Sequence, residues 1–401
     1  MPKIKNKHTK PGYKKTKLGW IPRDWDCSQL NKVFKLTSGN TKPQSFNESK
    51  TEEYPFPVYG GNGIMGYTNE YFVENKVLVI GRVGEYCGSA RLINEKCWIT
   101  DNALYTKQIT DTFSEKFLLY LLQKFDFRRL RNKGGQPLIS QKPIYLLIIC
   151  HPLKPEQQKI AQILSTWDRA IEIQTKLIKK YVLRKKRLMQ QLLTGKKRFE
   201  GFENEWNAMK FSDFLKPISR QVDKPKEEYL SIGIRSHGKG TFQKRDFDPE
   251  KIQLEKLFVV KKDDLIVNIT FAWEGAIAIV KNIDDGALVS HRFPTFTFET
   301  KKMCVNYFRH IIKQPRFVYL MKVISPGGAG RNRVLSQKDF LQLKLSFPST
   351  KEQQKIADVL EAADNEIKAM KETLEKLKEQ KKGLMQQLLT GKTRVKVKEE
   401  K

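Results

Sequence analysis

Three short patterns in the sequence have the residue types of cofactor-binding or catalytic sites. Gly61, Gly63 and Gly66 form a G-x-G-x-x-G run, whose glycines would let the backbone approach a dinucleotide or a methyl donor. That chemistry requires a strand before the glycines and a helix after them. Pro55 and Pro57 precede this run, and a β-like or loop segment follows it. We therefore interpret it as a glycine-rich turn or a place where the backbone approaches DNA.

The other two patterns fail on spacing or on context. Gly391-Lys392-Thr393 resembles the end of a phosphate-binding P-loop, but Gln386 stands where the first glycine is required. Glu379-Gln380-Lys381 has the E-x-K form of some nucleases, within a segment of alternating charges that is typical of a solvated helix face. No two prolines are adjacent, so the N-P-P-aromatic motif of amino-methyltransferases is missing. The sequence therefore predicts no catalytic residues.

Cysteine and histidine residues are scattered and form no metal-binding motif. There is no C-x-x-C pair and no H-x-H or H-E-x-x-H cluster. We predict no metal site, and the odd number of irregularly spaced cysteines favours a reducing cytoplasm over a disulfide framework. The cysteines are Cys27, Cys87, Cys97, Cys150 and Cys304, and the histidines are His8, His151, His237, His291 and His310.

The composition indicates a polyanionic partner. The chain has 401 residues, of which 39% are hydrophobic, and a formal net charge of +31. This length predicts two or three domains, each with a core of its own. A charge of this size concerns partners rather than fold, and it indicates DNA, RNA or an anionic membrane surface.

The sequence supports neither membrane insertion nor export. No apolar run approaches the ~18 residues of a spanning helix. The segment 1–17 carries seven Lys and no acidic residue, and no apolar stretch follows it, so we do not interpret it as a signal peptide. It is either a solvated tail or a flexible arm that contacts phosphates.

A long internal repeat organises the chain. Residues 156–198 align without gaps to residues 352–394, and 22 of the 43 positions are identical. The letters EQQKIA open both copies, and LMQQLLTGK closes both. Each copy is typical of one long helix, because Pro155 precedes the first copy and Gly195 and Gly391 follow the last apolar positions.

Apolar residues in both copies recur in steps of four and three, which is the period of a coiled coil. A helix with one apolar seam needs a partner, so we expect the two copies to pair with each other, most simply antiparallel and with approximate two-fold symmetry. Polar Gln174, Lys185 and Lys381 interrupt the seam. The position shared by the two lysines either sets the register or marks where the helices stop touching. The residues predicted for the seam are Ile160, Leu164, Trp167, Ile171, Ile178, Leu188, Ile356, Leu360, Ile367, Leu374, Leu377 and Leu384.

Two further segments, about Trp20 to Pro152 and Trp206 to Pro348, share an order of elements without sharing a sequence. Each begins near a Trp in a polar context, continues with short β-like runs and an amphipathic helix, and then reaches a Gly-rich basic loop. Strands followed by a helix predict two α+β domains. The β-like runs are 76–81, 89–93 and 98–105 in the first segment and 264–269, 276–280 and 293–298 in the second. The helices are predicted near 114–130 and 306–323, before the loops 131–135 and 327–333.

This alternation of two unlike domains with two near-identical helices resembles the specificity subunits of type I restriction-modification systems. The resemblance is carried by the helix openings P-x-x-x-E-Q-x-K-I at Pro152 and Pro348, by the LMQQLLTGK closings and by the segment 59–67, YGGNGIMGY. It covers nearly the whole chain except the lysine-rich N-terminal tail. The second domain has no copy of segment 59–67, so its target cannot be inferred by analogy.

The expected fold is α+β, with two α/β-type target-recognition domains separated by two long helices that pack as an antiparallel coiled coil. The resemblance implies that each domain reads one half of a split DNA site. It also implies that the helices set the spacing of the halves and dock two modification subunits, which methylate adenine with S-adenosylmethionine, and that restriction subunits join this core in the cytoplasm. This subunit would catalyse nothing and bind no cofactor. The predicted division is 1–17 for a basic flexible tail, 18–152 for target-recognition domain 1, 153–198 for spacer helix 1, 199–348 for target-recognition domain 2, 349–394 for spacer helix 2 and 395–401 for a charged tail.

Double-stranded DNA is the expected ligand, and the basic loops are the expected binding face. Lys and Arg contacts to phosphates supply affinity, whereas side chains at base edges read the sequence. Each candidate could instead be a solubilising surface charge. The run 179–187, with six basic residues and no acid, either follows phosphates between the half-sites or only solvates the helix. The candidates are Arg82, Arg91, Arg128, Arg129, Arg131 and Lys133 in the first domain and Arg235, His237, Lys239, Lys244, Arg245, Arg292, Arg331 and Arg333 in the second.

Two other classes of protein compete with this interpretation. One is a coiled-coil scaffold with non-specific nucleic-acid binding, although a net charge of +31 exceeds what solubility needs. The other is an RNA-binding protein, although no aromatic-rich strand of the RNA-recognition type is present. DNA binding that did not depend on salt would favour the scaffold.

Overall fold

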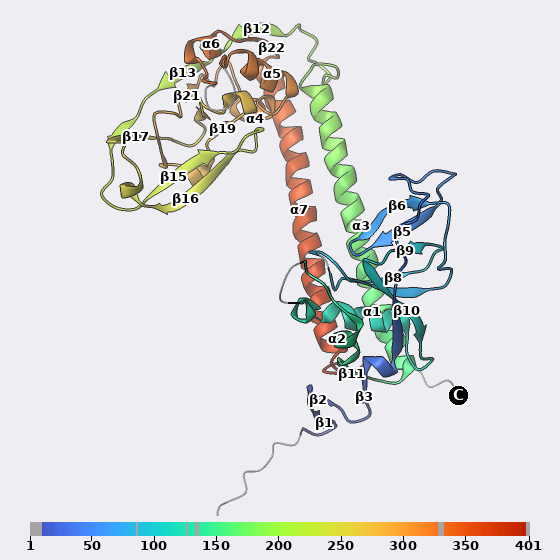
Figure 1. Ribbon diagram of the computed structural model, residues 1–401. Helices are drawn as coiled ribbons and strands as arrows, with labels where there is room; N and C mark the ends of the chain where they lie inside the picture. Colours follow the sequence, from blue (N-terminus) through green and yellow to red (C-terminus); the bar gives the residue numbers. More distant parts are fainter. Residues whose placement is uncertain (1–9, 86, 126, 133–135, 328–332, 398–401) are drawn as a thin grey trace, which may run out of the picture. The chain divides into compact units, whose positions relative to one another are not determined.

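The structure is a computed structural model that describes residues 10–85, 87–125, 127–132, 136–327 and 333–397. The chain divides into two compact units, of which unit 1 comprises Met1–Lys176 with Glu372–Lys401 and unit 2 comprises Leu177–Lys371. Two long helices, α3 (Lys154–Leu192) and α7 (Thr350–Leu388), each contribute one part to both units (Figure 1).

The parts of α3 and α7 within each unit run antiparallel. In unit 1, Ile160 and Leu164 from the beginning of α3 share a core with Leu388 from the end of α7. In unit 2, Leu192 from the end of α3 shares a core with Ile356 from the beginning of α7. Early residues of one helix thus meet late residues of the other in both units. All twelve residues predicted for the seam lie in buried or half-buried positions.

Both long helices end in the way that their glycines predict. Gly195 and Gly391 follow the last helical turns with φ of 70° and 68°, the left-handed conformation that glycine adopts without strain. A Cβ on Gly391 would lie 2.5 Å from the ring of Pro22 and 3.3 Å from Trp25. A Cβ on Gly195 would lie 3.2 Å from Trp206. Each glycine therefore stops a helix and lets the Trp at the start of a domain pack against that end.

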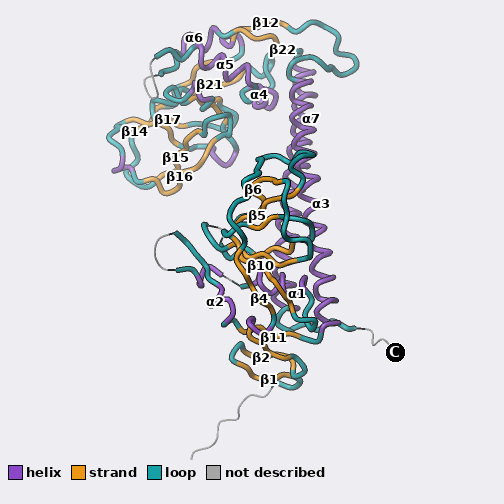
Figure 2. Tube along the Cα trace, turned by 45° about the vertical axis from the view of Figure 1, so that its right-hand side comes forward, coloured by secondary structure: helices purple, strands orange, loops and turns teal. Residues whose placement is uncertain are grey.

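Unit 1 carries a four-stranded sheet in the order β4-β10-β7-β8 and a three-stranded sheet in the order β6-β5-β9 (Figure 2). Strands β5 and β6 form an antiparallel hairpin, and β5 pairs in parallel with β9. Helix α1 (Glu115–Lys124) packs against β7 and β8. The strands are β4 (Phe34–Ser38), β5 (Phe56–Gly60), β6 (Gly63–Thr68), β7 (Val77–Gly81), β8 (Ala90–Ile93), β9 (Trp98–Ile99) and β10 (Ala103–Ile109).

Unit 2 repeats this topology with two further strands, β14 and β17, in its second sheet. Its four-stranded sheet has the order β13-β21-β18-β19, and its second sheet has the order β14-β17-β20-β15-β16. Strands β15 and β16 form the antiparallel hairpin, and β15 pairs in parallel with β20, as β5 does with β9. The strands are β13 (Leu215–Ile218), β14 (Gln221–Asp223), β15 (Tyr229–Ile234), β16 (Thr241–Phe247), β17 (Lys256–Val259), β18 (Leu265–Val267), β19 (Ile277–Ile279), β20 (Leu288–Val289) and β21 (Thr295–Phe298).

A short two-stranded sheet closes each domain next to its long helix. In unit 1, β3 (Asp26–Gln29) pairs with β11 (Ile148–His151), which leads into α3. In unit 2, β12 (Asn207–Lys210) pairs with β22 (Lys344–Phe347), which leads into α7. The remaining short helices are α2 (Gln141–Tyr145), α4 (Val305–Ile311), α5 (Pro315–Val323) and α6 (Gln337–Gln342).

Three predicted segments differ from the structure for physical reasons. The predicted run 98–105 is two strands, because a turn at residues 100–102 separates β9 from β10. The predicted helix 306–323 is the two helices α4 and α5, because Pro315 lacks the N–H that a helix interior needs and begins α5 instead. Residues 13–16 of the predicted flexible tail form strand β1 (Tyr13–Thr16), which pairs with β2 (Gly19–Pro22). Residues 1–9 of that tail lie outside the described residues.

The sequence favoured a reducing cytoplasm over a disulfide framework, and one pair of cysteines contradicts that expectation. Cys27 in β3 lies directly opposite Cys150 in β11, and a disulfide joins them. The two residues are 123 positions apart in the chain, so no local motif could reveal the pairing. In the corresponding strands of unit 2, Ala208 lies opposite Ser346. The fold thus forms the same strand pair without a covalent bond.

No helix among the described residues is long and apolar enough to span a bilayer. Within the same residues, His, Cys, Asp and Glu side chains form no group of three or more that could hold a metal ion.

Candidate nucleic-acid interface

In unit 1, the loop 82–89 between β7 and β8 gathers three of the predicted DNA-binding residues. Arg82 opens the loop and donates to Ser38 Oγ over 3.3 Å. Arg91 follows the loop and donates to the carbonyl of Gly61 over 3.2 Å. Arg131 reaches in from a separate segment and donates to the carbonyls of Glu85 and Cys87 over 2.6 and 3.2 Å. Two cations at the ends of this loop and a third from a distant segment therefore lie together.

The G-x-G-x-x-G run spans the turn of the β5–β6 hairpin and the start of β6, since Gly61 lies in the turn and Gly63 and Gly66 lie in the strand. Among the described residues no helix directly follows the glycines, and a backbone approach to DNA stays a prediction. A Cβ on Gly61 would lie 2.9 Å from the carbonyl of Val83, so only glycine allows this close approach. Arg91 is half-buried here, and desolvation lowers the pKa of its guanidinium, although an arginine stays charged. Ile64 and Met65 on β6 are exposed, with 50% and 42% of their surface accessible. The hairpin thus presents apolar side chains next to cations.

In unit 2, the loop 268–276 between β18 and β19 takes the same place in the topology. The N–H of His237, in the turn of the β15–β16 hairpin, donates to the carbonyl of Glu274 over 2.8 Å. Arg292 donates to Thr270 Oγ1 over 3.2 Å. The Arg333 guanidinium lies 5.4 Å from the ring centre of Trp273. The hairpin turn, the loop that holds Arg292 and the segment that holds Arg333 therefore meet at one loop, as their counterparts do in unit 1.

The other predicted residues of unit 2 extend this surface along the hairpin. Arg235, Lys239, Lys244 and Arg245 are all exposed. Arg235 also stacks over Phe242, 5.1 Å from the ring centre. In unit 1, Arg129 is exposed. Lys133, Arg331 and the side chain of Arg128 lie outside the described residues.

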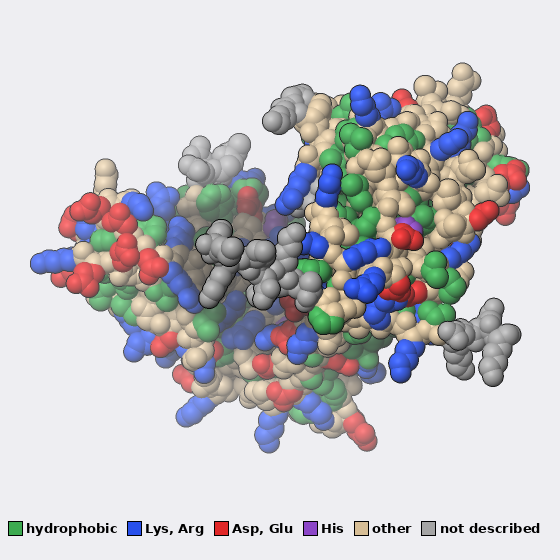
Figure 3. All heavy atoms as spheres, turned by 90° about the horizontal axis from the view of Figure 1, so that it is seen from below, with side chains coloured by type: hydrophobic (Ala, Val, Ile, Leu, Met, Phe, Trp, Pro, Cys, Tyr) green, Lys and Arg blue, Asp and Glu red, His purple; other side chains and the backbone are tan. Residues whose placement is uncertain are grey.

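Surface charge alone does not single out this interface. Figure 3 shows Lys and Arg side chains spread over the visible face, with Asp and Glu side chains between them. We locate the interface from the fold instead, because the same two-sheet topology brings cations to the same loop in both units. Trp273 at the centre of the second loop was not predicted. Its position two residues before Gly275, between two β-like runs, was the signal available in the sequence.

The repeated ends of the long helices hold the domains through buried polar contacts that the sequence reasoning also missed. Arg394 donates two bonds to Glu156, over 2.8 and 2.7 Å, and Arg198 donates two to Glu352, over 3.0 and 2.7 Å. Bonding to Glu352 raises the pKa of Arg198, which keeps this pair ionised. Each EQQKIA opening thus meets the arginine that follows a TGK closing. The repetition of both motifs was the available signal.

The glutamine after each of these glutamates anchors the neighbouring domain. Gln157 is fully buried, accepts from the N–H of Ser114 over 3.0 Å and donates to the carbonyl of Pro152. Gln353 is fully buried too, accepts from the N–H of Cys304 over 2.8 Å and donates to the carbonyl of Pro348. The accepted N–H lies at the start of α1 in unit 1 and of α4 in unit 2. The repeat therefore positions a helix of each domain in the same way.

The polar seam position has a defined partner in each unit. Lys381 on α7 pairs with Asp168 on α3 in unit 1, and Lys185 on α3 pairs with Asp364 on α7 in unit 2. In unit 1, Tyr120 donates to Asp168 over 2.6 Å. These ion pairs cross between the helices, which favours the register interpretation over the alternative that the helices stop touching here.

Comparisons with known proteins agree with this architecture. The family model described as type I restriction modification DNA specificity domain matches residues 22–180 and again 203–379. The MjaVIII specificity subunit of a type I restriction enzyme from Methanocaldococcus jannaschii is 25% identical over 406 residues, covering 94% of each chain. The putative MjaX specificity subunit from the same organism is 25% identical over 426 residues, covering 96% of this chain and 97% of that one.

A solved structure also shares the fold. The S subunit of a type I restriction-modification system from M. genitalium aligns with a TM-score of 0.59 and 18% sequence identity, over 91% of this chain and 96% of that chain. The first match covers the domain before α3 and most of α3, and the second covers the domain before α7 and most of α7. The chain therefore belongs to the family of type I restriction-modification DNA specificity proteins.

Proposed function

We propose that this chain is the DNA-reading subunit of a type I restriction-modification complex and that it recognises a split target, one half with each unit. The observation that carries the proposal is the repeated interface. In both units the same topology brings a β-hairpin turn and cations from separate segments to one loop between the third and fourth strands of the four-stranded sheet. The loops differ in sequence, so the two units would read different bases.

The proposed contacts to DNA are of two kinds, those that add affinity and those that read the base sequence. The exposed Arg235, Lys239 and Arg245 suit phosphate contacts, which add affinity without sequence information. Side chains nearer the loop centres, such as Trp273 and Ile64, would meet base edges in the groove. The two loops share a place in the topology and differ in their side chains, so one scaffold would read two different sequences.

The long helices would serve the complex in two ways. Each is 39 residues long, about 58 Å at the helical rise of ~1.5 Å per residue, so helix length would set the number of unread bases between the halves. Their remaining surfaces would dock two modification subunits, which would supply S-adenosylmethionine and methylate adenine, and restriction subunits would join that core. The chain itself would act without catalysis or cofactor, in the cytoplasm where the DNA is.

The disulfide between Cys27 and Cys150 stands against a strictly reducing setting. The DNA target and the family nevertheless favour the cytoplasm, because the partners and substrate of such a complex are there. A cross-strand disulfide that is reduced in the cell would leave the strand pair in place, as Ala208 and Ser346 do in unit 2.

The test is DNA binding by the full chain together with purified modification subunits, measured against salt concentration. We expect one duplex with a split sequence to be retained from a random pool, and the logarithm of affinity to fall steeply with the logarithm of salt concentration as counterions are released. A flat salt response, or equal retention of all sequences, would favour a scaffold with non-specific binding.

A further inference from the structure

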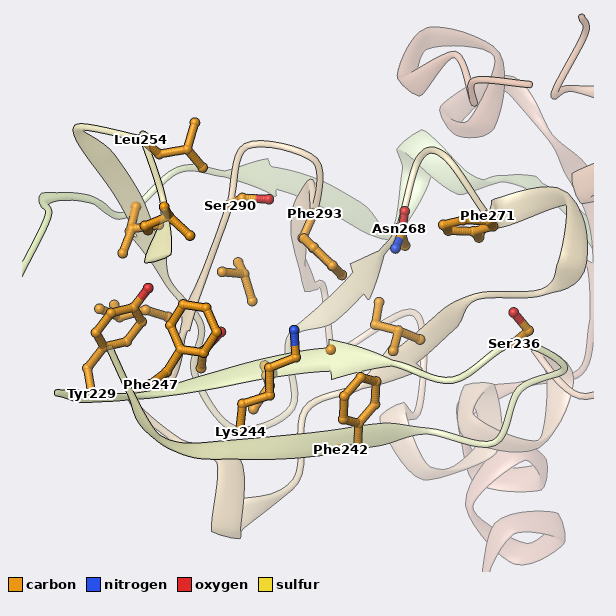
Figure 4. A pocket seen from close by; sticks show the side chains of 18 of the residues that line it. Tyr229, Ser236, Phe242, Lys244, Phe247, Leu254, Asn268, Phe271, Ser290 and Phe293 are labelled. Carbon is orange, nitrogen blue, oxygen red and sulfur yellow. The ribbon is translucent and has the colours of Figure 1, made fainter. Parts of the chain in front are cut away.

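Unit 2 contains an open cavity of about 490 Å³ beside the loop 268–276. The β15–β16 hairpin forms one wall, and the loops before β17, after β18 and after β20 form the others (Figure 4). Cavities of roughly 300–1,000 Å³ are the size that hold small ligands. This cavity lies in the domain with the predicted DNA contacts, because His237 and Arg292 flank the segments that line it.

The cavity combines half-exposed aromatic rings with one unpaired cation. Tyr229, Phe242, Phe247, Phe271 and Phe293 line it, and each is only half-buried. A phenylalanine ring that is partly exposed to a cavity can stack with a planar ligand. Unstacked nucleic-acid bases bind on aromatic rings in this way.

Lys244 supplies the positive charge, whereas the carboxylate of Glu274, which also lines the cavity, accepts from Ser236 Oγ over 2.6 Å. Figure 4 shows the side chain of Lys244 rising from β16 into the cavity, between Phe247 on one side and Phe242 on the other. Its Nζ lies 5.5 Å and 5.9 Å from the centres of these two rings. Among the described residues, no carboxylate lies within 4.0 Å of this ammonium group, so it is available for an anionic ligand.

Asn268 adds a polar group on the opposite side of the cavity. Its Oδ1 already accepts the N–H of Thr270 over 3.1 Å, so the side chain can offer its amide Nδ2 as a donor. Figure 4 shows Asn268 across the cavity from Lys244, with Phe293 nearby. A planar heterocycle with an acceptor on its edge and a phosphate attached would match the rings, the amide and the ammonium together.

We propose that this cavity binds a single nucleotide, with its base against the ring of Phe293, an acceptor on the base edge at Asn268 and its phosphate near Lys244. This inference deepens the proposed DNA-reading function and rests on it. The nucleotide is either one that leaves the stack of the bound duplex or a free mononucleotide. The free energy lost when a base leaves the stack is similar to the free energy gained when it binds on aromatic rings.

The first experiment uses 2-aminopurine deoxyribonucleoside 5′-monophosphate and the full-length chain. We expect saturable binding at one site per chain. Phe293→Leu keeps the side chain apolar but removes the ring face, and Lys244→Gln removes the charge. Each should weaken binding about tenfold, the scale of one lost base–aromatic stack. The control Lys256→Gln, on β17 of the same sheet, changes a lysine that pairs with Asp223 outside the cavity lining and should leave binding unchanged.

The second experiment places single 2-aminopurines along a duplex that carries the target half-site of unit 2, in complex with the modification subunits. If the nucleotide comes from DNA, fluorescence rises at one position on binding, and Phe293→Leu abolishes that rise while the duplex stays bound. If free nucleotide binds in the first experiment and no position responds here, the cavity takes a free mononucleotide.

The outcomes separate this proposal from the proposed function. Duplex binding with no nucleotide binding in the first experiment and no responding position in the second would overturn the cavity proposal alone. Nucleotide binding that depends on Phe293 and Lys244, without any duplex binding, would overturn the DNA-reading function and leave the cavity as a nucleotide site. Responses that Phe293→Leu and Lys244→Gln do not alter would also refute the assignment.

Discussion

At the scale of single residues, the two Arg–Glu pairs at the helix ends matter most for stability, because each places a carboxylate at a buried position. Glu352 is 1% exposed, so its carboxylate depends on the two bonds from Arg198. Glu156 has the same relation to Arg394, which also bonds to Asp24. Bonding to Arg394 lowers the pKa of Asp24 in turn. Charge pairing at buried positions thus explains why the ends of the two long helices share their residues.

Replacing Arg198 by Met should destabilise unit 2, because it leaves a buried carboxylate without a partner. Breaking a buried ion pair on one side costs about 3–5 kcal/mol. We expect the free energy of unfolding in urea to fall by about that amount. Adding Glu352→Gln should restore much of the loss, since the stranded charge is then gone. A loss below about 1 kcal/mol in the single variant would show that solvent reaches Glu352.

The buried imidazole of His310 predicts a pH dependence of stability. Burial lowers its pKa to about 4, and the nearby Lys313, Lys185 and Arg309 act in the same direction while Asp364 opposes them. The unfolded chain has the usual His pKa of about 6.5, so it binds a proton more readily than the folded chain between these values. Stability from the neutral imidazole is therefore complete above about pH 6.5 and is lost as the pH falls toward 4.

The expected loss across that window is about 3 kcal/mol, from ~2.5 pKa units at 1.36 kcal/mol each. The measurement is the free energy of unfolding from pH 7.5 to pH 4 for the wild type and for His310→Gln. The variant should lose about 3 kcal/mol less than the wild type over this range. Parallel curves for the two proteins would mean that the imidazole takes up its proton without cost in the folded state.

At the scale of elements, the ion pairs across α3 and α7 predict a register control within each unit. Lys185→Asp would place two carboxylates together at Asp364, with an expected loss of about 1 kcal/mol because the Asp side chain is 46% exposed. Adding Asp364→Lys should restore the pair and the melting temperature. Lys180→Asp is the matched control, since Lys180 is exposed on the same helix. Equal effects of Lys185→Asp and Lys180→Asp would refute a register role.

The disulfide between β3 and β11 should stabilise unit 1 and leave unit 2 unaffected. It closes a loop of 123 residues, for which loop-closure entropy gives about 4–5 kcal/mol. Dithiothreitol or the Cys27→Ala/Cys150→Ser variant, which copies the residues of unit 2, should lower the unfolding transition of unit 1 alone. Hydrogen exchange resolves the two units. Equal loosening of both, or no change in either, would contradict this expectation.

Much of the element order was predictable, because it is local in the sequence. The helix stops at Gly195 and Gly391 and the apolar steps along 156–198 are read from neighbouring residues. The pairing of Cys27 with Cys150 and the bonds from Arg131 to the loop 82–89 were not predictable, since they join residues far apart in the chain. The break at Pro315 was visible in the sequence but was missed.

At the scale of the whole molecule, the interface with DNA was also predictable only where it depends on local sequence. The basic loops were identified by residue type, but only the two-sheet topology shows that Arg91, Arg131 and the hairpin turn meet at one loop. Five aromatic residues from four segments line the cavity beside β15 and β16 in unit 2, and these segments form no motif in the sequence. Which bases are read depends on side-chain placement at the interface with DNA.

The central claim is that each unit reads one half of a split target independently. The direct measurement is a map of methylated adenines in a host that carries this chain with its modification subunits, before and after residues 25–139 are replaced by the corresponding segment of the M. jannaschii relative. We predict a two-part methylated sequence in which only one half changes after the replacement, while the other half is retained. A change in both halves, or a methylated sequence without two parts, would contradict the account.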